Sequence, residues 1–275
     1  MAAETAADLF ARLGQKKSVD GLDKQLFASL PHGVKLRDVI EIYGDVGCGK
    51  TNILLHLTAN CILPSAWEGV FLGGRGVKLI FVDNDYHFSL LRLVEILEER
   101  VRESFMQQNC TIPSGMESFI KSCLSRLIVA KCKSTDQFLT TVETLNEILR
   151  QDADICVMMI DSVSAFFFLD RNIAGSGYKA HECYQRKLVQ LVRRYIDQYN
   201  LVVLATVPAI SSKDSRSVTK VEDYSYMGRS WRNLVTYAFV VSREASTFSM
   251  KLVKPVPKQA DLVVEFSIEK TGLMF

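Results

Sequence analysis

The stretch GDVGCGKT at residues 44–51 decides the fold, because it satisfies the pattern Gly-x-x-x-x-Gly-Lys-[Ser/Thr] between an apolar run and an amphipathic segment. The glycines let the backbone fold into a concave nest of inward-pointing amides, next to the positive end of the following helix. Lys50 can then reach the β and γ phosphates of a nucleotide, and Thr51 can offer its hydroxyl to Mg²⁺. The alternative is a glycine-rich turn with an incidental lysine, which the flanking strand and helix patterns disfavour. We therefore expect ATP and Mg²⁺ to bind at Gly44, Asp45, Val46, Gly47, Cys48, Gly49, Lys50 and Thr51.

A lone carboxylate ends the apolar run ICVMMID at residues 155–161. In a P-loop fold, an aspartate at the carboxyl end of a neighbouring strand holds the water shell of Mg²⁺. Asp161 is thus the metal candidate, together with Thr51. The competing interpretation is that Asp161 only caps a following helix.

A second acidic strand end is FVDNDYHF at residues 81–88. A carboxylate here could activate the attacking water, and Asp85 is the candidate, with Asp83 as the fallback. The alternative is that both aspartates cap a helix beginning near residue 87, where acidic groups suit the helix dipole.

From residue 36 onward, short apolar runs alternate with longer amphipathic segments, which predicts βα units on a mostly parallel sheet flanked by helices. The expected strands are 38–43, 77–82, 127–131, 155–160 and 201–205, and the expected helices are 50–62, 87–104, 115–125, 134–150 and 180–199. Three later strands, expected at 236–242, 247–253 and 263–268, are close enough in sequence to form an antiparallel extension. We expect residues 1–35 to be a short helix and a polar connection, and 36–275 to be one α/β core domain.

Composition narrows the class of protein. The chain has 275 residues, of which 48% are hydrophobic, and its 33 Lys and Arg nearly balance 31 Asp and Glu. A formal charge of only +2 excludes nucleic-acid or membrane binding by bulk charge alone, although a local basic patch is compatible with it. The seven cysteines have no zinc-site spacing, and no signal peptide or membrane span is present. We expect a cytosolic or nuclear protein.

Several phrases, in this order, resemble the RecA-like recombinases of eukaryotes, and within them the shorter paralogues. These phrases are GDVGCGKT, CILP at 61–64, FVDNDYHF, IDSVSAFF at 160–167 and MGRSW at 227–231. The resemblance covers about residues 36–275 and is more specific in CILP and DYHF than in the P-loop. It implies a RecA-like P-loop NTPase core.

Two departures from the family pattern concern hydrolysis. Active recombinases carry a glutamate where this chain has Asp85, which is shorter by one methylene. They also end the strand that follows the metal-binding strand with a glutamine that senses the γ-phosphate. This chain has Val207 and Pro208 at that place. The resemblance therefore implies nucleotide binding with weak or absent hydrolysis. The alternatives are a catalytically active, DNA-stimulated ATPase and a small-substrate P-loop kinase, the latter disfavoured by the lack of an arginine-rich lid.

The two DNA-facing loops of the family correspond to about residues 170–180 and 208–228. Tyr224 and Tyr226 are available to stack on bases, but the small net charge suits a surface loop equally well. The cationic candidates for contact with single-stranded or branched DNA are Arg171, Lys213, Arg216, Lys220 and Arg229.

The resemblance also implies a biological role and partners. We expect a nuclear recombinase-paralogue subunit in homologous-recombination repair of DNA double-strand breaks, assisting the strand-exchange recombinase. Active recombinases polymerise through an N-terminal domain and linker, and only about 35 residues precede the first strand here. We therefore expect this chain to form a hetero-oligomer with other paralogues and to occupy the end of that array. We expect no membrane association.

Overall fold

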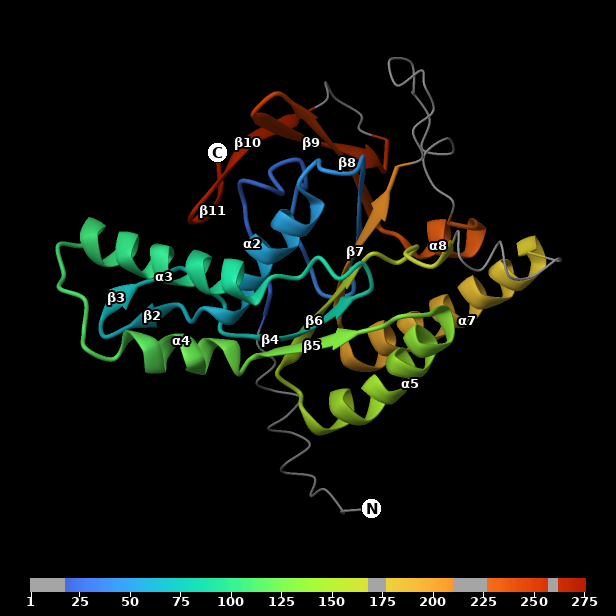
Figure 1. Cartoon of the computed structure of the whole chain (residues 1–275), viewed down its shortest axis with the longest axis horizontal. Helices are drawn as coiled ribbons and strands as arrows, with labels where there is room; N and C mark the ends of the chain where they lie inside the picture. Colours follow the sequence, from blue (N-terminus) through green and yellow to red (C-terminus); the bar gives the residue numbers. More distant parts are fainter. Residues whose placement is uncertain (1–17, 168–176, 210–226, 257–261) are drawn as a thin grey trace.

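The computed structural model describes residues 18–167, 177–209, 227–256 and 262–275, and a nine-stranded sheet forms its centre (Figure 1). The strands are β1 (Val39–Gly44), β2 (Ala66–Trp67), β3 (Val70–Phe71), β4 (Lys78–Asp83), β5 (Leu127–Lys131), β6 (Ile155–Asp161), β7 (Val202–Pro208), β8 (Tyr237–Glu244), β9 (Thr247–Lys254), β10 (Val263–Glu269) and β11 (Gly272–Met274). The helices are α2 (Lys50–Ile62), α3 (Leu90–Gln107), α4 (Met116–Leu124), α5 (Thr135–Gln151), α7 (Gly177–Tyr199) and α8 (Arg229–Leu234).

The strand order is β11-β10-β9-β8-β1-β7-β6-β4-β5. The strands from β8 through β5 pair in parallel, and β8, β9, β10 and β11 continue the sheet as antiparallel neighbours. A separate two-stranded ribbon joins β2 to β3. The fold is therefore a mostly parallel α/β sheet with an antiparallel C-terminal extension, as the sequence predicts.

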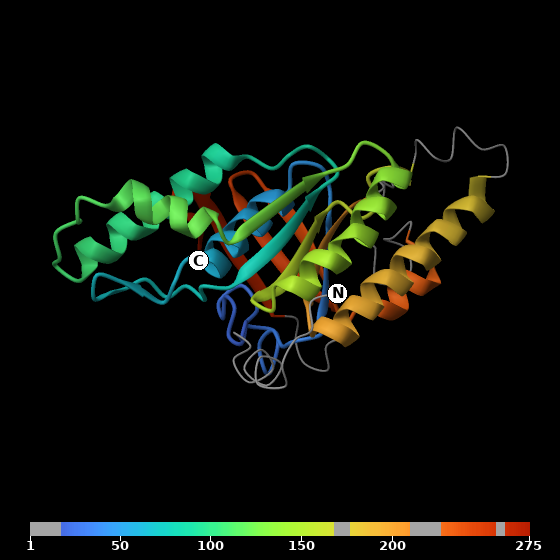
Figure 2. The ribbon, with the colours of Figure 1, turned by 90° about the horizontal axis from the view of Figure 1, so that it is seen from below.

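Helices cover both faces of the sheet, because successive residues of each central strand point to opposite sides. In β4, Leu79 and Phe81 belong to one hydrophobic cluster, whereas Ile80 and Val82 belong to the other. The first cluster packs under α2, α3 and α4, and the second under α5, α7 and α8 (Figure 2). Apolar runs without alternation follow from burial on both sides.

The stretch that precedes β1 corrects one prediction. The later part of residues 1–35 was expected to be a polar connection, but from residue 18, where the described part begins, it packs tightly on the core. Its apolar residues recur every three or four positions and turn inward, so they are nearly inaccessible to solvent: Val19, Leu22, Leu26, Phe27, Leu30 and Val34. The short helix expected before it lies outside the described residues.

The predicted strands and helices agree with the structure to within about three residues at most ends. The pattern missed four short elements, β2, β3, α8 and β11, because two to six residues are too few to establish a period. No helix in the described ranges is both long enough and apolar enough to span a membrane.

Candidate nucleotide-binding site

Four parallel strands, β1, β4, β6 and β7, end at the same edge of the sheet. Gly44 pairs with Pro208 across β1 and β7, and Asp83 pairs with Asp161 across β4 and β6. In open α/β sheets, ligands bind beyond the carboxyl ends of the strands. The P-loop and both acidic strand ends predicted from the sequence therefore meet at one place.

The P-loop follows β1 and leads directly into α2. Gly49 precedes the helix with a φ of 89°, a left-handed conformation that glycine adopts without strain. A Cβ on Gly44 would lie 2.3 Å from the Val241 carbonyl oxygen, so only glycine fits where β1 passes β8. Lys50 Nζ donates to the carbonyl oxygens of Gly44 at 2.8 Å and Asp45 at 2.7 Å. The lysine thus lies across the loop that would hold a phosphate.

Thr51 and Asp161 are brought into direct contact. Thr51 Oγ1 donates to Asp161 Oδ2 at 2.7 Å, and Thr206 Oγ1 on β7 donates to the other carboxylate oxygen, Oδ1. Thr206 was not singled out from the sequence, although it lies one residue before Val207. The structure therefore brings together the two residues predicted to hold the metal, and Thr206 contributes a second hydroxyl to Asp161.

The environment of Asp161 suits a cation. Burial raises the pKa of this carboxyl, as do the nearby charges of Asp85 and Asp83, while the hydrogen bonds from Thr206 and Thr51 lower it. A cation would favour the charged form. Beside Asp161, three buried oxygens have no hydrogen-bond partner within the described ranges, namely Asn84 Oδ1, Ser162 Oγ and Ser164 Oγ.

Oxygen donors of this kind fit a hard divalent ion and its water shell. Thr51 and Asp161 are the residues that would hold such an ion. When bound, the ion supplies positive charge that offsets the charge of the phosphate chain.

The two aspartates of the second acidic strand end have different surroundings. Asp83 is fully buried and accepts hydrogen bonds from the backbone nitrogens of His87 at 3.0 Å and Phe88 at 3.4 Å. It therefore orders the turn before α3, whose cap is Ser89. Asp85 is half-buried and lines the nucleotide pocket. The geometry favours Asp85 over Asp83 as the carboxylate available to a water.

The pocket has a volume of about 490 Å³ and extends beyond the predicted residues. Gly49 touches the C-terminal extension, since a Cβ on it would lie 3.2 Å from Phe248 Cδ1 and 3.1 Å from Ile268 Cδ1. The wall residues missed by sequence analysis come mainly from this extension and from the start of α3: His87, Ser89, Arg92, Pro208, Arg243, Phe248 and Ile268. His87 lies in FVDNDYHF and Pro208 at the position of the absent glutamine, but neither was assigned to the pocket. The other five lie in no motif, so only the packing of distant strands reveals them.

One DNA-contact candidate can be placed. Arg229 is exposed and begins α8. The other candidates lie outside the described residues: Arg171, Lys213, Arg216, Lys220, Tyr224 and Tyr226.

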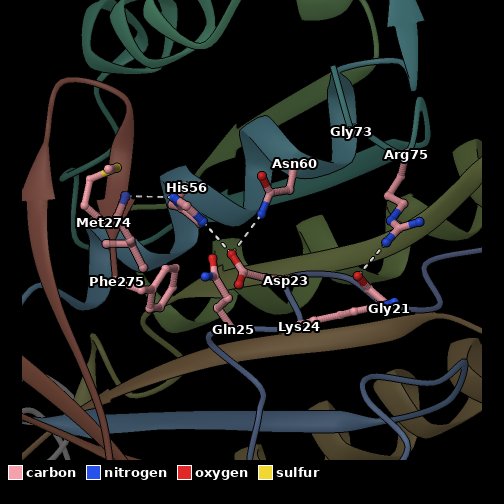
Figure 3. Close-up of a pocket in the computed structure, with 11 residues that line it drawn as sticks. Gly21, Asp23, Lys24, Gln25, His56, Asn60, Gly73, Arg75, Met274 and Phe275 are labelled. Carbon is pink, nitrogen blue, oxygen red and sulfur yellow. Dashed lines mark hydrogen bonds and ion pairs between the residues drawn. The ribbon is translucent and has the colours of Figure 1, made fainter. Parts of the chain in front are cut away.

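A second cavity, of about 430 Å³, lies near the C-terminal strand (Figure 3). At its floor, His56 Nε2 is 2.5 Å from Asp23 Oδ2, and Asn60 Nδ2 donates to the same oxygen at 3.0 Å. His56 Nδ1 accepts from the Leu273 nitrogen at 2.8 Å and from Arg100 Nη2 at 2.6 Å. These polar groups form hydrogen bonds with one another. Their contacts connect β11 to α2, α3 and the segment before β1.

Comparison with known proteins agrees with this fold. The Rad51 family model matches residues 18–228. The chain is 32% identical to the DNA repair protein XRCC2 of Mus musculus, over 99% of this chain and 97% of that protein. It is 26% identical to the XRCC2 homolog of Arabidopsis thaliana, over 90% and 79% of the two chains. It is 24% identical to RAD51 homolog 3 of Dictyostelium discoideum, over 76% of this chain and 53% of that protein. The resemblance to recombinases is confirmed, and the chain belongs to the Rad51 family.

Proposed function

We propose that this chain is a recombination-repair paralogue that binds ATP and Mg²⁺ at residues 44–51 and Asp161. The nucleotide pocket serves binding or assembly of a complex more than hydrolysis of ATP. The recombination-repair role rests on its membership of the Rad51 family and on its similarity to proteins named for DNA repair. The Rad51 and RadA relatives imply nucleotide binding with a divalent metal. The choice of ATP and Mg²⁺ is our proposal.

The observation that carries the proposal is the contact between Thr51 Oγ1 and Asp161 Oδ2 at 2.7 Å, beside a nest that contains Lys50. A phosphate chain in the nest would meet the lysine and the metal ligands together. Burial raises the pKa of the Cys48 thiol, so no thiolate opposes an anion in the loop.

Two features support slow turnover. Asp85 lines the pocket, but its side chain is one methylene shorter than the glutamate of active recombinases. Val207 is fully buried, and it has no side-chain amide at the place where those enzymes sense the γ-phosphate. A misplacement of about 1 Å in a catalytic group lowers a rate by on the order of a hundredfold. The position of Asp85 is the observation that keeps a DNA-stimulated ATPase as the second candidate.

Partners are part of the proposal. Large apolar side chains are exposed near the pocket, with Val46 at 89% and Leu91 at 83% of full exposure. Apolar side chains left exposed beside a pocket favour contact with another protein. We propose other recombinase paralogues as that partner, single-stranded or branched DNA as a ligand of the complex, and the nucleus as its location.

Isothermal titration of the purified chain with ATP, with and without Mg²⁺, tests nucleotide binding. We expect Lys50→Ala to weaken ATP binding in both conditions and Asp161→Asn to remove the gain that Mg²⁺ brings. Arg150→Ala, which removes an exposed cation on α5, is the control. Equal affinity of the wild type and Lys50→Ala contradicts the assignment of the P-loop.

Turnover is measured separately, as released phosphate with and without single-stranded DNA. We expect a rate far below the ~1 to 10³ per second of ordinary enzymes. A DNA-stimulated rate within that range would establish the second candidate instead. Purification from cells, followed by mass spectrometry of the bound proteins and nucleotide, tests the proposed partners.

A further inference from the structure

Among the residues that the structure describes, three Lys and Arg side chains line the nucleotide pocket, and they differ in how their donors are used. Lys50 donates to the backbone carbonyls of Gly44 and Asp45. Arg92 is held by Glu95 Oε2 at 2.5 Å and by the carbonyl oxygens of Glu269 and Lys270. The third cation is Arg243, near the end of β8 in the C-terminal extension.

Arg243 is oriented by its own hairpin. Its Nε donates to the Ala245 carbonyl oxygen at 2.9 Å, and its Cζ lies 5.2 Å from the centre of the Phe248 ring. Both contacts leave the two terminal nitrogens without an acceptor among the described residues. A guanidinium held by one edge presents the remaining donors in a fixed geometry, which matches phosphate oxygens.

The position of Phe248 relates this guanidinium to the phosphate nest. The same ring that lies under Arg243 packs against Gly49, where a Cβ would lie 3.2 Å from Phe248 Cδ1. One aromatic ring therefore separates the amides that begin α2 from the arginine. Arg243 is exposed on the pocket side, so a ligand reaches it without displacing a partner.

We propose that Arg243 binds the phosphate chain of the nucleotide from within the same chain, as a second cation beside Lys50. This inference rests on the proposed nucleotide binding and adds a residue from the C-terminal extension to that site. The extension then closes over the nucleotide, so that the phosphates lie between the P-loop and the β8–β9 hairpin.

The test is competitive binding of three unlabelled probes against a fluorescent ATP analogue. ATP carries both base and phosphates, tripolyphosphate carries only phosphates, and adenosine carries only the base. We expect Arg243→Gln to weaken the binding of ATP and of tripolyphosphate by about 10- to 100-fold and to leave the binding of adenosine unchanged. Arg243→Lys should give an intermediate loss, because it keeps the charge without the planar fork.

Arg150→Ala is the matched control, because it removes an exposed cation outside the pocket. The thermal unfolding midpoint of each variant without nucleotide checks folding, and Arg243→Lys serves if Arg243→Gln is unstable. This inference is overturned if the wild type and the Arg243 variants bind ATP equally well while Lys50→Ala binds it more weakly. That result leaves the proposed function intact. If the variants lose affinity for adenosine but not for tripolyphosphate, Arg243 contacts the base, and this inference is again overturned. A wild-type chain that binds no ATP overturns both.

Discussion

Asp161 shows how single residues tune the proposed metal site. Its two carboxylate oxygens accept hydrogen bonds from threonines on different elements, Thr51 on α2 and Thr206 on β7. Each hydroxyl stabilises the charged form of a buried carboxylate that burial itself disfavours. The two threonines therefore lower the pKa of Asp161, against the larger raising effect of burial.

Replacing Thr206 tests this role. Thr206→Val keeps the side-chain shape and removes the hydroxyl, so the pKa of Asp161 should rise further. We expect Mg²⁺-dependent ATP affinity to fall by about tenfold, with Mg²⁺-free affinity unchanged, as measured by titration calorimetry. Thr144→Val on the exposed face of α5 is the control. A uniform loss with and without Mg²⁺ would mean that Thr206 supports the fold and not the metal site.

At the scale of elements, β11 is attached to the molecule by polar contacts. Gly272 begins this strand with a φ of 114°, and a Cβ there would lie 2.5 Å from His56 Nδ1 and 2.9 Å from Arg100 Nη2. We expect Gly272→Ala to reduce the free energy of unfolding by about 2–4 kcal/mol, because backbone strain adds to the clash.

Gly33→Ala is the matched control for that substitution. Gly33 also has a positive φ, of 64°, but a Cβ there meets nothing within 4 Å. Its cost should be only the strain, about 1 kcal/mol. Urea unfolding of both variants measures the difference, and equal costs would show that the contact between β11 and His56 contributes nothing.

The short helix α8 is attached to β1 through one buried hydrogen bond. Trp231 is fully buried, and its Nε1 donates to Glu41 Oε2 at 2.6 Å. Burial raises the pKa of Glu41, against the lowering effects of Trp231 and of the Lys254 and Arg232 charges.

Trp231→Phe removes the donor and leaves the carboxylate without it. We expect a loss of about 1–3 kcal/mol in the free energy of unfolding, and a smaller added loss in the Glu41→Gln background. A double-mutant cycle by urea unfolding measures this coupling. Additive losses would show that the hydrogen bond contributes no net stability and that packing alone holds α8.

At the scale of the whole molecule, the cluster around His56 makes stability depend on pH. Burial lowers the pKa of His56 below 6.5, the Arg100 charge lowers it further, and the Asp23 hydrogen bond opposes both. Burial also lowers the pKa of Arg100 to about 10, so this guanidinium stays charged at neutral pH. Since His56 Nδ1 accepts two hydrogen bonds, the folded chain contains the neutral ring with its proton on Nε2.

The sign of the pH effect follows. As pH falls below 6.5, the unfolded chain binds a proton at this histidine more readily than the folded chain does, so stability decreases. Other groups titrate too, and therefore the comparison is with His56→Asn. We expect the stability advantage of the wild type over this variant to be largest above pH 6.5 and to shrink toward pH 5. A constant gap in urea unfolding across that range would contradict the prediction.

How much could be predicted differs between the fold and the site. The central strands and long helices follow from hydrophobic period alone, because burial on a sheet face acts locally along each strand. The P-loop, Asp161 and Asp85 could be found because parallel strands bring their carboxyl ends to one edge. The inward packing of residues 18–34 was missed, because its apolar positions recur every three or four residues along a series of turns and not along one regular helix.

The sequence by itself determined the α/β class, the nucleotide motif and the acidic strand ends, since each depends on residues adjacent along the chain. Only the tertiary structure decided which side chains complete the pocket. Thr206, Arg243 and Phe248 reach it because β7 and β8 both pair with β1, and because β9 folds back on β8. Contacts between residues far apart in sequence depend on strand order and register, and no local pattern encodes these.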